Sequence, residues 1–147
     1  MATIETLMLA NYAEALNGML YVMGGGWTQH TRSIGPEQEY PPTSNISIAI
    51  TVLTPWGDTN RRHVVRVWVE SADGGDALME VNGEMEVGRP PGTTQGSDLR
   101  SVIAVNGVVA YPSEGDYRVL ATVREDGEAE KWVSFTVHDK KVGPLSP

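Results

Sequence analysis

The 147-residue sequence contains no cysteine. Without cysteine the chain can form neither a disulfide framework nor a thiolate metal site, and it has no thiol nucleophile. It also has no apolar run near the ~20 residues that a membrane-spanning helix needs, and its first residues lack the features of a signal peptide. We therefore expect the protein in the cytoplasm, or in a virion if a phage encodes it.

Positive charge is scarce as well. Eleven Lys and Arg stand against 19 Asp and Glu, which gives a formal net charge of −8. A protein that binds nucleic acid needs a basic stripe to displace counterions, and here the basic residues are scattered. The densest basic segment, residues 61–63, is interpreted as a solvated loop. Nucleic acid and anionic membrane surfaces are therefore excluded as expected partners.

The sequence is rich in alternating patterns and turn residues, which predict an all-β fold. Residues 46–53 alternate between large aliphatic and smaller or polar side chains, and residues 112–117 (Pro-Ser-Glu-Gly-Asp-Tyr) precede a second alternating run. A Pro and a Gly that lead into a Tyr are typical of the tyrosine corner of β-sandwiches, so Tyr117 is expected to bond to upstream backbone. We predict one domain over residues 1–147, a β-sandwich of about eight mostly antiparallel strands with Greek-key, immunoglobulin-like character.

Near the N-terminus the expected elements are short. Residues 6–10 and 19–23 are predicted to be strands, and residues 11–16 are predicted to form one helical turn between them. Asn17-Gly18 indicates a tight turn before the second strand.

The last two predicted strands allow a register to be assigned. If Tyr117 and Val119 face the core, pairing them with the apolar residues of 131–137 requires a three-residue loop at 125–127, with Gly127 in a left-handed conformation. This register places Leu120 opposite Trp132 on the outer face of the sheet, where Trp68 extends the row. The interface candidates are therefore Trp132, Leu120 and Trp68.

No arrangement of residues predicts catalysis or metal binding. The three histidines lie in different predicted elements, and the Gly24–Gly26 run lacks the helix and the lysine of a phosphate-binding loop. The acidic residues of 80–86 are interpreted as a solvated row on one strand. We therefore expect neither enzyme activity, nor a cofactor, nor a metal.

The aromatic residues leave a second function open. Sugar-binding domains stack ligands on exposed rings, and Trp27, Tyr40 and Trp56 are the candidates for such a site, together with Trp68.

Two segments resemble a known family. The first segment is similar to the N-terminal part of a family of uncharacterised bacterial and phage-encoded domains; it consists of Leu7-Met8-Leu9-Ala10, followed by Asn17-Gly18 and by Gly24-Gly25-Gly26-Trp27. The second segment, residues 112–117 with 133–137, is similar to the C-terminal part of that family. Asn11 and Met19 replace an Asp and a Lys that are common in that family. The resemblance implies a β-sandwich and no assigned activity.

The expected function is therefore a non-enzymatic structural or protein-interaction module that contacts a protein partner or another copy of itself. It could be a subunit of a larger assembly such as a phage virion, as a capsid decoration or tail component. The alternative is a small-ligand or carbohydrate-binding module.

Overall fold

The computed structural model describes residues 1–143, which form ten strands and one 3-10 turn where about eight strands are predicted. The strands are β1 (Thr3–Ala10), β2 (Tyr12–Leu16), β3 (Met19–Met23), β4 (Gln29–Ile34), β5 (Ser44–Pro55), β6 (Arg62–Ser71), β7 (Met79–Glu86), β8 (Asp98–Val109), β9 (Gly115–Thr122) and β10 (Lys131–Lys141), and the turn is η1 (Trp56–Asp58). The fold is all-β, as the alternating patterns predict. No helix in the described part of the chain is long and apolar enough to cross a membrane.

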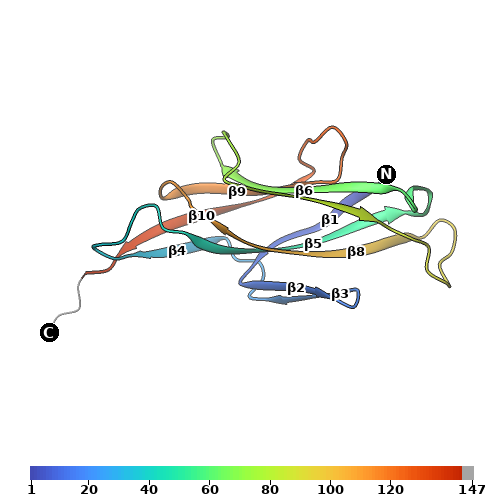
Figure 1. The fold of residues 1–147 in the computed structure, drawn as a ribbon, viewed down its shortest axis with the longest axis horizontal. Coiled ribbons are helices and arrows are strands. Elements are labelled where there is room, and N and C mark those ends of the chain that lie inside the picture. Colours follow the sequence, from blue (N-terminus) through green and yellow to red (C-terminus); the bar gives the residue numbers. More distant parts are fainter. Residues whose placement is uncertain (144–147) are drawn as a thin grey trace.

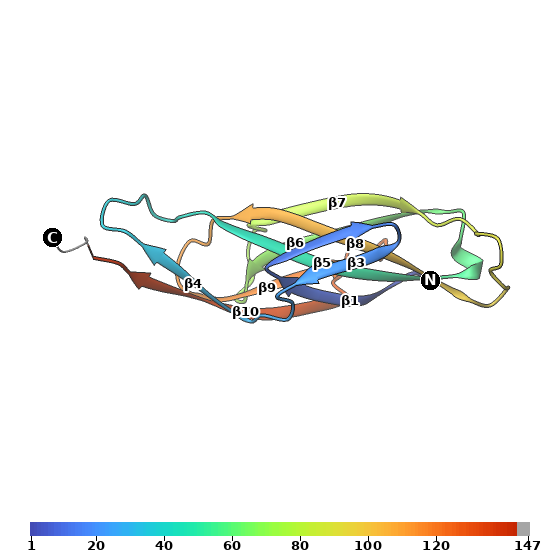
Figure 2. The ribbon, with the colours of Figure 1, turned by 90° about the horizontal axis from the view of Figure 1, so that it is seen from below.

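Two sheets form a sandwich-like arrangement (Figures 1 and 2). One has the strand order β1-β5-β8, and the other has the order β4-β10-β9-β6-β7. The ladders are antiparallel except for the one between β4 and β10, which is parallel. The additional pair β2-β3 makes a separate two-stranded sheet, which lies beside the three-stranded one (Figure 1).

The core lies between the two larger sheets. Alternate residues of β5, from Ile46 to Val52, point into it and are at most 2 % exposed, as are Val67 and Val69 of β6. The intervening residues of β5 are also buried, because β2 lies across the outer face of this sheet. The central strand is therefore covered on both faces.

The tyrosine corner has the predicted geometry. The Tyr117 hydroxyl at the start of β9 donates a 2.6 Å hydrogen bond to the Ser113 carbonyl. Because this carbonyl lies upstream of the strand, the bond holds the entry of the chain into β9.

The register of the last hairpin is also as predicted, but its loop is longer. Val119 pairs with Val133, and Gly127 has φ +75°. The ladder stops at Ala121, so the connection is longer than the predicted three residues. The reason is Glu130, whose carboxylate accepts the N–H of Val123 at 2.8 Å and so replaces a ladder bond.

The helical turn expected at residues 11–16 is wrong, because the segment is strand β2. Asn17 (φ +51°) and Gly18 (φ +73°) connect it to β3 with the two left-handed residues of a type I′ hairpin turn. On its other edge, β2 is attached to the sandwich, where the Asn106 amide donates to the Ala13 carbonyl at 2.9 Å. Tertiary contacts thus override the helix propensity of the segment.

Candidate interaction surfaces

The hairpin β2-β3 has one inward and one outward face. Cross-strand partners share a face, and Ala13, which pairs with Val22, is fully buried against the sandwich. The pairs of opposite parity therefore point away from it, namely Tyr12–Met23, Glu14–Tyr21 and Leu16–Met19. Five of these six side chains are large and apolar or aromatic.

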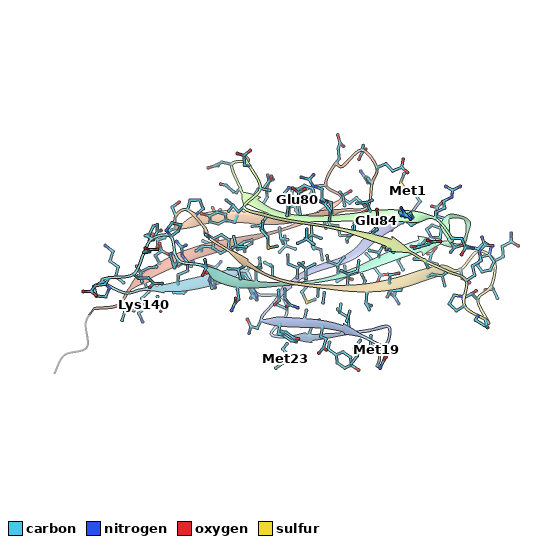
Figure 3. The ribbon with its side chains drawn as sticks, in the orientation of Figure 1. Met1, Met19, Met23, Glu80, Glu84 and Lys140 are labelled. Atoms are coloured by element: carbon cyan, nitrogen blue, oxygen red, sulfur yellow. The ribbon has the colours of Figure 1, made fainter. Side chains whose placement is uncertain are left out.

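These five side chains are accessible. The exposed fractions are 48 % for Tyr12, 50 % for Leu16, 55 % for Met19, 48 % for Tyr21 and 67 % for Met23. Figure 3 labels Met19 and Met23, which mark the two ends of this row along β3. We call this set, with Glu14, the hairpin face.

Sequence reasoning missed the hairpin face, although a signal was present. The turn pair Asn17-Gly18 is followed directly by an unbroken apolar run, residues 19–23, and this combination indicates a hairpin whose first strand precedes the turn. The assignment of residues 11–16 as helical concealed this hairpin.

The glycines after β3 return the chain to the sandwich. A Cβ atom on Gly25 would lie 2.6 Å from Sδ of Met8 and 2.8 Å from Cγ1 of Val22, so a side chain there would have to displace both of these side chains. Trp27 then packs edge-on against Phe135, with 5.5 Å between the ring centroids. The glycine run thus has a structural role here.

The row Trp68–Leu120–Trp132 is paired as predicted, but it is not an open patch. Trp132 is 57 % exposed, whereas Leu120 and Trp68 are only 5 % and 7 % exposed. The Arg66 guanidinium lies 4.0 Å over the Trp68 ring, and the Trp68 indole donates to Glu70 at 3.3 Å. Of the three interface candidates on this outer face, Trp132 alone is therefore accessible.

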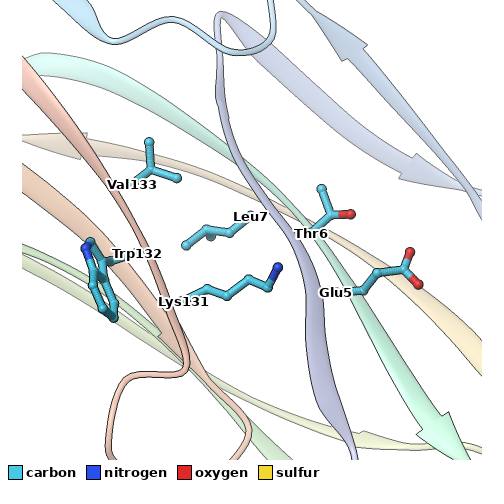
Figure 4. A pocket seen from close by; sticks show the side chains of 6 residues that line it. All are labelled: Glu5, Thr6, Leu7, Lys131, Trp132 and Val133. Atoms are coloured by element: carbon cyan, nitrogen blue, oxygen red, sulfur yellow. The ribbon is translucent and has the colours of Figure 1, made fainter.

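Trp132 borders a shallow groove between β1 and β10. The groove has a volume of about 480 Å³. Leu7, Lys131 and Val133 point into the space between the two strands, whereas Trp132 points to the outer side of β10 (Figure 4). The remaining lining residues are Glu5 and Thr6. We call this space the edge groove.

The candidate ligand-binding rings do not converge. Trp27 packs on Phe135, Tyr40 lies in the loop after β4, and Trp56 lies in η1 at the other end of the sandwich, under the guanidinium of Arg89 at 4.1 Å. These rings therefore do not form a common stacking platform.

Tyr40 instead belongs to a polar network around the buried side chain of Arg32. The Arg32 guanidinium donates to both carboxylate oxygens of Asp139 (2.6 and 3.0 Å), to the Tyr111 carbonyl (2.7 Å) and to the Tyr40 hydroxyl (2.9 Å). The hydrogen bonds from Arg32 lower the pKa of Asp139 below its usual value. Since each group has partners, the network ties the loop after β4 to β10 and offers no free reactive atom.

The histidines lie apart and have separate partners. His30 bonds to Ser44, His63 to the Asp58 carbonyl, and His138 to Gln29. Within residues 1–143, no three His, Asp or Glu side chains are grouped as metal ligands would be.

Comparison with known proteins gave one family match. The family model described as "Family of unknown function (DUF6941)" matches residues 5–138, a span that includes the hairpin face and the lining of the edge groove. The search of curated proteins gave no match.

Proposed function

The chain belongs to DUF6941, a family of unknown function, and from its surfaces we propose that it is a non-enzymatic interaction module that contacts a protein partner through the hairpin face. The observation that carries the proposal is the concentration of exposed apolar side chains on one short hairpin. Of the 13 large hydrophobic residues that are exposed in the described chain, six lie within residues 12–23.

This concentration is unusual for a surface in contact with water. Single exposed apolar side chains need no explanation, but a contiguous patch larger than a few hundred Å² usually marks a contact. Tyr and Met are enriched at protein interfaces, and Met adapts to irregular partner surfaces. The hairpin face combines Tyr12, Tyr21, Met19 and Met23 in this way.

The hairpin is also held in place before any partner binds. The Asn106 amide donates to the Ala13 carbonyl, and the Ser47 hydroxyl donates to the Asn106 side chain at 2.5 Å. A face that is already ordered loses less conformational entropy on binding. The hairpin therefore suits recognition better than a free loop would.

The proposal extends to a subunit of a larger assembly such as a virion, because such a subunit needs contact surfaces and no chemistry. The alternative, carbohydrate binding through Trp27, Tyr40 and Trp56, has less support because these rings lie apart.

The test is to remove the apolar character of the hairpin face without touching the core. The double variant Met19→Ser/Met23→Ser changes two exposed side chains, and Val64→Ser/Val108→Ser is a matched control, since these valines are 50 % and 56 % exposed elsewhere. Each variant is expressed in the organism whose genome encodes the protein, and the complexes that it forms there are quantified by affinity purification and sedimentation velocity. We expect the hairpin variant to lose the complex and the control to keep it. Equal complex formation by both variants, or a wild-type protein that is monomeric and copurifies with nothing, would contradict the proposal.

A further inference from the structure

The edge groove exposes a length of strand backbone that has no neighbouring strand. The ladder between β10 and β4 begins at Thr136, so residues 131–135 of β10 pair with β9 on one side only. A strand edge of this kind presents a row of N–H and C=O groups that can accept another strand.

The groups that point into the groove can be identified. The Thr136 N–H donates to the Thr28 carbonyl on the β4 side. In a strand, the backbone groups of alternate residues point to the same edge. The N–H and C=O groups of Trp132 and Ser134 therefore point to the side where β4 is missing.

The groove is closed at both ends. At one end the Glu130 carboxylate accepts the Ile4 N–H at 3.0 Å, and at the other Gly26 donates to the Leu9 carbonyl at 2.7 Å. The free edge of β10, residues 131–135, has a length of five residues at ~3.3 Å each. The site therefore fits a short extended segment.

Lys131 determines which kind of segment fits. It occupies a core-facing position of β10, and its side chain extends into the groove beside Leu7 (Figure 4). Within the described chain it forms no ion pair. The Glu5 carboxylate also lines the groove, but it is already paired with the Arg100 guanidinium at 2.8 Å. The hydrogen bond from Arg100 lowers the pKa of Glu5, and Lys131 is close enough to help lower it. An inward-pointing charge at an edge disfavours pairing with a neutral strand, which would bury the ammonium group without a partner. A strand with a carboxylate at that position would pair with it.

We propose that the edge groove binds a short, extended, acidic segment of a partner protein, which adds as a strand to β10 between Trp132 and Ser134. Backbone hydrogen bonds provide the affinity, and the Lys131 ammonium selects a carboxylate on the inward face of the segment. The Trp132 ring covers the outward face. This inference does not depend on the hairpin face.

The experiment uses amide NMR and two capped pentapeptides, VTVTE and its reverse ETVTV, so that both strand directions are tested. Peptides with Gln in place of Glu serve as controls. In the free protein the amides of Trp132 and Ser134 should exchange rapidly with solvent, and binding should slow this exchange by about tenfold. The Glu peptides should bind about threefold more tightly than the Gln peptides, as expected for a partly exposed ion pair.

Two variants separate the contributions. In Lys131→Met the preference for Glu should disappear while the Gln peptide still binds, and Met19→Ser/Met23→Ser should bind like the wild type. The proposal is overturned if the Trp132 and Ser134 amides are protected in the free protein, or if no peptide shifts their signals at millimolar concentration. Equal affinity for Glu and Gln peptides would overturn the selection by Lys131.

Discussion

Among single residues, the buried polar side chains have the most specific roles. Tyr117 anchors the entry to β9 through one hydrogen bond, and Arg32 is 4 % exposed yet charged. Removing a partner from such a group leaves the other partner buried and unsatisfied.

For Tyr117→Phe we expect a loss of roughly 0.5–1.5 kcal/mol in the free energy of unfolding, because the Ser113 carbonyl loses its donor. Chemical denaturation measures this loss. Tyr21→Phe is the control, since Tyr21 is 48 % exposed and its hydroxyl can be solvated. Equal midpoints for Tyr117→Phe and the wild type would show that the corner bond contributes nothing.

Asp139→Asn should lower the free energy of unfolding at neutral pH by about 3 kcal/mol, which is more than for Tyr117→Phe. The reason is that the Arg32 guanidinium would stay buried without its counter-charge. The pKa of Asp139 is lowered in the folded state, chiefly by the hydrogen bonds from Arg32. Its contribution to stability is therefore complete above the unfolded-state pKa of about 4 and is lost as the pH falls through the lower folded-state value.

Denaturation of both proteins from pH 7 to pH 2 tests this dependence. The difference between Asp139→Asn and the wild type should shrink below about pH 4. Glu5→Gln, which breaks the exposed pair with Arg100, should have a much smaller effect at neutral pH. A difference that stays constant with pH would show that Asp139 does not stabilise the fold through its charge.

Sequence patterns predicted Tyr117 but not the Arg32–Asp139 pair. The corner is local, since Tyr117 and Ser113 are four residues apart. The ion pair joins residues 107 positions apart, and no periodicity indicates which charge will meet which. The burial of Leu120 was missed for a similar reason, because it depends on the way in which the long side chains of neighbouring strands pack over the outer face of the sheet.

At the scale of elements, the register between β9 and β10 was predictable, because the core determines it. The secondary structure of residues 12–16 was not predictable in this way. Shifting a strand by one residue exchanges its buried and exposed faces, so the pairing of Val119 with Val133 followed from side-chain type alone. Residues 12–16 include two alanines, a glutamate and a leucine, all good helix formers, and their pairing with β3 and contact with the sandwich make them a strand.

The return segment after this hairpin gives a prediction for Gly25. Gly25→Ala should destabilise the protein by about 1–3 kcal/mol, because the new methyl group would crowd Met8 and Val22. Gly57→Ala is the control, because a Cβ there meets open space, and its effect should stay within about 0.5 kcal/mol. If the two variants unfold at the same denaturant concentration, the hairpin is not packed as tightly as described.

At the scale of the whole molecule, the two candidate surfaces occupy different places. The hairpin face lies outside the three-stranded sheet, whereas the edge groove lies where β1 and β10 run side by side. One chain could therefore hold two neighbours at once, which is the requirement for a subunit of an assembly.

Net charge affects how readily those neighbours can be identical copies of the chain. Each copy carries −8, so identical chains repel one another at low ionic strength. If the hairpin face mediates self-association, raising the salt from about 0.02 M to about 0.5 M should strengthen it, because salt screens the repulsion and leaves the apolar contact intact. Sedimentation velocity of wild type and Met19→Ser/Met23→Ser at both salt concentrations measures this effect, and only the wild type should show the increase. Association that weakens with salt would instead indicate an attraction between charged groups, and the hairpin face would then not be the contact between copies.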